Sequence, residues 1–486
     1  MLVTSRHFRP DVTVTLIVLV WAMYTTPRLV QSLTGVKRRA TVGDALPMNP
    51  LAVKLEVLLL LLVFALCAFV ILRGTAALPT DRRMPLVLML APWVYVVVRD
   101  LYIDHVPTRG GMLYPVLVVA IWILRPQLRK LAVLGYLVVL TAVMCIALGV
   151  FLPESGIFIS SAGTAVAPTK EILPLGILIG IFTDGNNLGQ YLVLGLPSVM
   201  LIPRRVVRAA GIAVVLFAIV WTSSRSSLAA AALACGMWVL MTVTPSVLRR
   251  PMSWGLVGAT GAVMIWWPLS TPADDALTNR GAIWRHSLDA WGNTPWFGSG
   301  SNWYSVLPQH VGSLGGFAFH GHNQFVHTLA TGGLIFLFLV AAMFVTIAWA
   351  ASQWSARGIF QPATLLVALF ASSTLEVSFG FVDRAFLLAV TVLPLMFAVF
   401  ALSPSMVRGV GTRSRGWSQP PSCARRRSVP VRRRLNCQSH ETAAITASIS
   451  PVAAPVSRIK PRRGVDANSG TGARVTVSPS MSGCSI

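Results

Sequence analysis

Long apolar runs alternate with short polar connections over residues 1–403 of the chain. Twelve of these runs approach the length of roughly 20 residues that an α-helix needs to cross a bilayer. The pattern predicts an all-α polytopic membrane protein with about 12 transmembrane helices. We expect them at residues 12–24, 51–72, 84–98, 112–124, 131–152, 187–202, 206–222, 227–243, 253–269, 325–350, 362–376 and 385–402.

Arginine in the short connections orients these helices. The basic connections fall on alternate sides in a way that places all of them in the cytoplasm, together with both termini. Three longer polar stretches, residues 99–111, 153–186 and 270–324, then lie on the outer side. Residues 25–50 are the exception, because this external segment would contain Lys37, Arg38 and Arg39.

Two apolar segments need a separate interpretation. The run from Val12 to Met23 follows Arg6 and Arg9 as in a signal peptide, but no small-residue cleavage site follows at residues 24–27. We therefore expect it to be retained as the first helix. Residues 171–182 are apolar but too short to cross the bilayer, so we expect a helix that lies at or dips into the outer interface.

Composition agrees with a membrane protein, since 55% of the 486 residues are hydrophobic and only 12% are charged. Half of the net charge of +24 comes from residues after Ser403, where 14 of the 40 Lys and Arg face two acidic residues. Residues 404–486 are rich in Ser, Pro and Arg, which predicts a disordered basic cytoplasmic tail after a transmembrane domain of residues 1–403. Its arginines suit anionic membrane lipids, and too few aromatic residues accompany them for nucleic-acid binding.

Three predicted helices begin on the outer side with conspicuous polar residues. The first has Asn187 with its neighbours, the second has Arg225 after Thr222-Ser223-Ser224, and the third has His322-Asn323. Asn and Ser at such positions cap free backbone N–H groups, and the partial positive charge of a helix N-terminus attracts phosphates. Alternatively, the asparagines only cap these helices at the water interface and bind no phosphate. The planar guanidinium of Arg225 matches phosphate oxygens, although it would also serve as an interface anchor.

The polar stretch 270–324 predicts a short amphipathic helix near residues 279–289, which ends before Gly292 and Pro295. Arg280 and Trp284 lie one turn apart on it, and both are candidate substrate-binding residues. Arg280 beside Arg225 would give two positive charges for a pyrophosphate. A salt bridge from Arg280 to Asp274 or Asp289 is the structural alternative.

His322 is the candidate catalytic base. The helix dipole and nearby arginines would disfavour its charged form and leave an imidazole that accepts a proton. His320 and His327 are rivals, and a structural hydrogen bond to the loop is the alternative. No DxD pair or Walker loop occurs in the sequence, so we expect phosphate binding by arginine without a metal or cofactor.

Together these residues resemble the O-antigen ligase and O-antigen polymerase superfamily of bacterial glycosyltransferases, over roughly residues 130–400. Four pieces carry the resemblance in order: Gly180 to Gly189, Thr222 to Ser227, Arg280 to Trp284 continuing to Pro295–Gly300, and His322-Asn323 followed by Gly332-Gly333. The external loop is compact and the basic tail has no counterpart in the family pattern, which leaves the acceptor open.

The resemblance implies transfer of a glycan from an undecaprenyl-pyrophosphate carrier to an acceptor hydroxyl, on the outer face of the cell membrane. Arg225 and Arg280 would bind the pyrophosphate, Asn187, Asn323 and Trp284 would line the substrate site, and His322 would activate the hydroxyl. A ligase and a polysaccharide polymerase are both consistent with it. Outside this class, the chain could be a transporter of lipid-linked sugars, or a carboxylate-dependent transferase relying on Asp100 and Asp104.

Overall fold

The computed structural model describes residues 10–34, 48–74, 82–103, 111–158, 171–271, 273–274, 276–305, 320–381 and 384–402. The chain divides into two units, residues 1–417 and residues 418–486, and every described residue belongs to the first unit. The predicted basic tail, the Lys37–Arg39 cluster and Asp104 fall outside the described residues.

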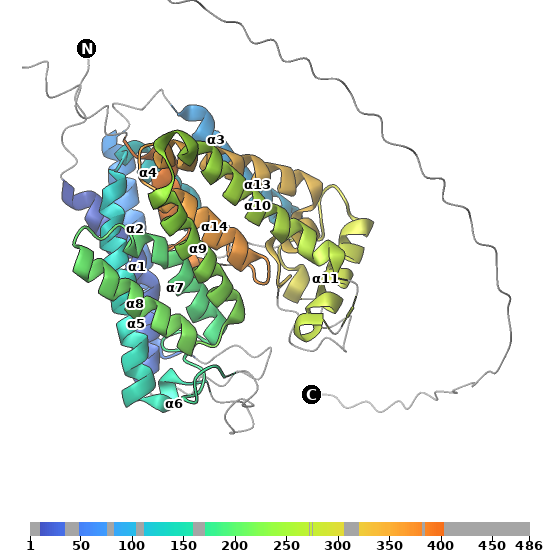
Figure 1. The fold of residues 1–486 in the computed structure, drawn as a ribbon. Helices are drawn as coiled ribbons and strands as arrows, with labels where there is room; N and C mark the ends of the chain where they lie inside the picture. The colour runs from blue at the N-terminus through green and yellow to red at the C-terminus, as the bar shows by residue number, and fades with distance from the viewer. Residues whose placement is uncertain are drawn as a thin grey trace, which may run out of the picture. The chain divides into compact units, whose positions relative to one another are not determined.

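The described residues form helices and contain no strand, only an isolated antiparallel bridge between Ile157 and Leu178 (Figure 1). This confirms the all-α class. A helix stands at each of the predicted apolar runs: α1 (Pro10–Leu33), α2 (Pro50–Gly74), α3 (Arg83–Tyr102), α4 (Leu113–Leu124), α5 (Ala132–Phe151), α7 (Gly185–Val199), α8 (Arg205–Trp221), α9 (Arg225–Val243), α10 (Ser246–Ser270), α13 (Gln324–Ala356), α14 (Gln361–Ser373) and α15 (Val392–Phe400).

Six segments of the described chain are long and apolar enough to cross a membrane. Five of them largely coincide with α1, α2, α3, α9 and α13, and the sixth, Leu128–Phe151, combines the short 3₁₀ helix η2 (Leu128–Leu131) with α5. The polytopic character is therefore confirmed, whereas twelve crossings and their orientation stay predictions. The last predicted run is broken into the 3₁₀ helix η5 (Ala385–Leu387) and the nine-residue α15.

The expected interfacial helix at residues 171–182 is wrong, because this segment consists of turns and extended backbone. Pro174 lacks the N–H group that a helix interior needs, and Gly176 and Gly180 have positive φ angles of 77° and 53°. The segment pairs with residues after α5 instead: α6 (Pro153–Gly156) ends at Gly156, whose carbonyl accepts from the N–H groups of Ile179 and Gly180.

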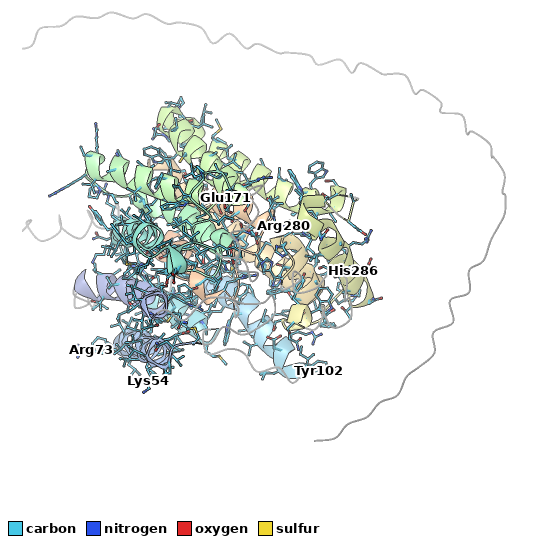
Figure 2. All side chains as sticks on the ribbon, turned by 90° about the horizontal axis from the view of Figure 1, so that it is seen from below. Lys54, Arg73, Tyr102, Glu171, Arg280 and His286 are labelled. Carbon is cyan, nitrogen blue, oxygen red and sulfur yellow. The ribbon has the colours of Figure 1, made fainter. Side chains whose placement is uncertain are left out.

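The interior of the bundle is built around α7, of which 13 of 15 residues are buried. Helix α7 packs against α5, α8, α9 and α14, while α10, α13 and α14 form a second packed group (Figure 1). Side chains at the edge of the molecule include Lys54, Arg73, Tyr102 and His286, whereas Arg280 lies toward its middle in the same view (Figure 2).

Helix α13 is interrupted at Gly333, whose φ of 66° and ψ of −165° are accessible almost only to glycine. The interruption leaves backbone groups of α13 without helical partners. The segment after α11 (Ala276–Asn293) supplies them: Ser299 and Gly300 donate to the carbonyls of Ala330 and Thr331, and the carbonyls of Pro295 and Trp296 accept from Leu334 and Ile335. The family-like piece 295–300 thus pairs with the residues on either side of the piece 332–333.

Gly333→Ala should destabilise the protein by about 2 kcal/mol or more, through the strained backbone and a clash. A Cβ at Gly333 would lie 2.5 Å from the backbone carbon and oxygen of Trp296. Gly236→Ala in α9 is the control, since a Cβ there meets nothing within 4 Å. Apparent melting temperatures in detergent measure both, and equal values for the two variants would contradict the expectation.

Candidate active site

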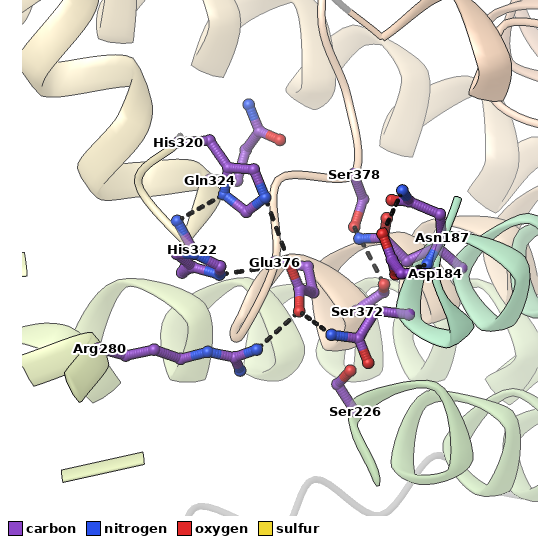
Figure 3. A network of polar contacts seen from close by, with 12 residues as sticks. Asp184, Asn187, Ser226, Arg280, His320, His322, Gln324, Ser372, Glu376 and Ser378 are labelled. Carbon is purple, nitrogen blue, oxygen red and sulfur yellow. Dashed lines mark hydrogen bonds and ion pairs between the residues drawn. The ribbon is translucent and has the colours of Figure 1, made fainter. Parts of the chain in front are cut away.

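One buried carboxylate, that of Glu376, gathers polar side chains from three other segments of the chain (Figure 3). Its Oε1 lies 2.7 Å from Nη2 of Arg280 and accepts from the Asn186 amide at 3.2 Å. Its Oε2 lies 3.5 Å from Nδ1 of His322 and 3.6 Å from Nε2 of His320. We call these five residues the Glu376 cluster.

Arg280 reaches the cluster from the first part of α11. Its side chain is 17% exposed, and it pairs with Glu376. The sequence had offered Asp274 or Asp289 as its structural partner. In the structure Asp274 instead forms an ion pair with Arg285, further along the same helix, where both side chains are about half exposed.

His320 and His322 lie in the short segment that precedes α13, with ring centroids 4.0 Å apart. The backbone N–H of His322, which has a left-handed φ of 45°, donates to Nδ1 of His320 at 3.0 Å. Because Nδ1 of His320 accepts this bond, its proton is assigned to Nε2, on the side of Glu376. His327, the other alternative candidate for the base, makes a different contact, because its ring stacks on the ring of Tyr304.

The electrostatics of the cluster favour an ionised carboxylate beside neutral imidazole. Glu376 is buried, and the guanidinium of Arg280 and the imidazole of His322 supply the opposite charge and polar contacts that an ionised carboxylate needs there. Burial, followed by the positive charge of Arg384 and the neighbouring His322, holds the pKa of His320 well below its usual value. At neutral pH the cluster therefore carries Glu376 as an anion and His320 without charge.

Of the two adjacent asparagines in the first turn of α7, the structure brings Asn186 to the cluster and not the predicted Asn187. The Asn187 amide donates to Thr183 and to Asp184, and Asp184 also caps α7 by accepting from the backbone N–H of Asn187. In Figure 3, Asp184 and Asn187 lie apart from Arg280 and His322. The structure therefore gives Asn187 a capping contact, and its predicted substrate contact stays a prediction.

Asn323 and Trp284 also make structural contacts. Asn323 caps α13 by accepting from Val326, and its amide donates to the carbonyls of Met264 in α10 and Thr374 after α14 at 2.9 and 3.0 Å. Trp284 is 1% exposed, and its indole N–H has no hydrogen-bond partner among the described residues. Asn323 thus joins three helices directly beside His322.

Arg225 is the first residue of α9, is exposed, and forms no ion pair with any described residue. The start of α9 packs on the first turns of α7, because a Cβ on Gly189 would lie 2.5 Å from Oγ of Ser227. Arg280 and His322 therefore meet on one carboxylate, while Arg225 starts a neighbouring helix without touching it.

His320, His322 and Glu376 also offer ligand atoms within 4.8 Å of one another, which is a spacing that a divalent cation could use. The guanidinium of Arg280, 2.7 Å from the same carboxylate, would repel such an ion and compete for its ligand. The sequence led us to expect no metal, and a chelator experiment below distinguishes the two cases.

Of the two carboxylates in the alternative transferase mechanism, only Asp100 is among the described residues, and it makes a structural contact. Asp100 is 1% exposed and accepts from the backbone N–H and the hydroxyl of Ser301, at 3.3 and 2.7 Å. This bond attaches the end of α3 to the segment after α11. Glu376, in contrast, was missed as a site residue; the signal in the sequence was a lone carboxylate at the end of an apolar run.

A family model described as O-antigen ligase matches residues 210–341. The matched range contains Arg225, Arg280 and His322, and it ends before Glu376. A comparison with curated proteins gave no match. The family match, the apolar helices and the order of the motifs agree, and they support the resemblance to the O-antigen ligase and polymerase superfamily.

Proposed function

We propose that the chain is a membrane glycosyltransferase that moves a glycan from an undecaprenyl-pyrophosphate carrier to an acceptor hydroxyl, as in O-antigen ligation. One observation carries the proposal: Arg280 and His322, which the sequence assigns to phosphate binding and proton transfer, converge on the same buried carboxylate. The family match supports a ligase or polymerase type of function. By the charge pattern of the connections, the reaction takes place on the outer face of the cell membrane.

Arg280 binds the pyrophosphate in this proposal, with Arg225 as the second cation. Its guanidinium holds a carboxylate in the ligand-free protein and presents the same planar donor pattern to phosphate oxygens. An arriving phosphate therefore competes with Glu376 for Arg280. Arg225 is exposed and forms no ion pair with a described residue, so it can approach the anion without breaking an existing pair.

His322 takes the proton of the acceptor hydroxyl. Its Nδ1 faces Glu376 at 3.5 Å, so a proton on Nδ1 leaves Nε2 as the acceptor for an incoming hydroxyl. The acceptor oxygen bonds to the anomeric carbon while the bond from that carbon to the phosphate oxygen breaks, with inversion. The hydroxyl proton goes to His322, and the electron pair leaves with undecaprenyl pyrophosphate, whose charge the arginines stabilise.

Arg280→Lys and His322→Ala should each lower glycan transfer by roughly 10²-fold or more, since each removes a group that acts on the reacting atoms. Arg285→Lys is the matched control, because it lies on the same helix in a half-exposed ion pair. Transfer is measured in a gene-deletion strain of the source organism that expresses each variant at equal membrane level. Normal glycan in the Arg280 and His322 variants would reject the proposal.

Transfer should continue in the presence of a chelator, since arginine side chains supply the positive charge. The measurement uses the purified protein in liposomes together with lipid-linked glycan and acceptor extracted from the deletion strain. Loss of transfer in chelator that is restored by a divalent cation would instead assign His320, His322 and Glu376 to a metal.

The stability of the protein should fall as the pH is lowered below about 6.5, the ordinary pKa of histidine. The pKa of His320 is depressed in the folded state, so the unfolded chain binds the proton first and gains stability. His320→Asn can still accept from the His322 N–H and should show a weaker decline between pH 7 and pH 5. His286→Asn, outside the cluster, should decline like the unmodified protein; identical curves for all three would contradict the assignment.

A further inference from the structure

An apolar groove lies between α10, α13 and α14 and has a volume of about 230 Å³. Its walls include Val257, Gly258 and Gly261 from α10, with Val340, Ala341 and Phe344 from α13 facing them. Gly258 and Ala341 are exposed and Val345 is 58% exposed, so the groove opens sideways. In a membrane protein such a face meets lipid, and the groove suits a flexible hydrocarbon chain.

One end of the groove adjoins the Glu376 cluster. Gln324 lines it two residues after His322, and Ser373 and Phe379 line it three residues before and after Glu376. The same end is held together by Asn323, whose amide bonds the carbonyls of Met264 and Thr374. The apolar groove therefore ends next to the charged side chains of the Glu376 cluster.

We propose that this groove binds the first isoprene units of the donor's polyprenyl chain, with the pyrophosphate at Arg280. The inference rests on the proposed function and adds the place where the lipid part of the donor lies. A lipid pyrophosphate needs cationic hydrogen-bond donors for its head group and an apolar surface beside them for its chain. The Glu376 cluster supplies the cationic donor Arg280, and the groove supplies the apolar surface. After the interruption at Gly333, the α13 residues that line the groove run from Leu337 to Ala348, which is roughly 16 Å at the helical rise and enough for several isoprene units.

Two glycines of α10 provide a matched test. A Cβ on Gly258 or on Gly255 would meet nothing within 4 Å, so both positions have room for a larger side chain. Only Gly258 lines the groove. Gly258→Leu fills the groove roughly 9 Å along α10 from Met264, whereas Gly255→Leu adds the same bulk outside it. Ala341→Leu fills the groove from the opposite wall.

Binding to the purified protein is measured with two probes that share a head group, undecaprenyl pyrophosphate and dimethylallyl pyrophosphate. The second carries a single isoprene unit, which is too short to reach the level of Gly258. Gly258→Leu and Ala341→Leu should weaken binding of the long-chain probe about tenfold, because they exclude methylene groups from the groove. Binding of the short probe should not change, and Gly255→Leu should bind both probes like the unmodified protein.

Arg280→Lys separates failure of the groove from failure of the proposed function, since it should weaken both probes equally. If Arg280→Lys weakens both probes while the two groove variants change neither, the groove holds ordinary membrane lipid and the proposal is overturned. If neither probe binds the unmodified protein, or if Arg280→Lys has no effect, the pyrophosphate site itself is rejected and the groove proposal with it.

Discussion

The burial of a single carboxylate, that of Glu376, governs how the polar segments at this end of the bundle are arranged. Removing an ionised carboxylate from water costs several kcal/mol unless hydrogen bonds and opposite charge replace the lost solvation. Arg280 from α11, Asn186 from α7 and the two histidines before α13 provide this replacement. Each of these segments is far from Glu376 in sequence, so one charge fixes the relative position of four segments.

The contact that stabilises the carboxylate also explains why the cluster suits anionic ligands. A guanidinium whose partner is a carboxylate can exchange it for phosphate, because both anions offer oxygens to the same planar pair of N–H groups. The carboxylate that is released remains beside His322 and can keep a proton on its Nδ1. In the proposed reaction, binding of the donor would thus leave the histidine oriented by Glu376 and Arg280 occupied by the leaving group.

The helices could be predicted from the sequence because their apolar runs are long, and each predicted run corresponds to a helix. The helix predicted at 171–182 was wrong because apolar content alone does not make a helix where Pro174, Gly176 and Gly180 interrupt it. Of the site, His322 was predicted from its position at a helix N-terminus, and Arg280 from its position on a short amphipathic helix. Glu376 has no local motif, and its role depends on side chains up to 190 residues away, as the Asn186 contact shows. The choice between Asn186 and Asn187 depends on which amide turns toward the cap of α7, which the sequence does not specify.

The distance between Arg280 and His322 is fixed by two attachments of the same loop. Arg280, near the start of α11, is held by Glu376, and the segment after α11 is held by backbone bonds to the interruption of α13 at Gly333. His322 and Asn323 precede α13 itself, so one helix carries the histidine at its start and the loop attachment about ten residues later. These two attachments, both within residues 280–300, keep the guanidinium beside the imidazole. Glycine at position 333 therefore contributes to the geometry of the cluster, although it touches none of its residues.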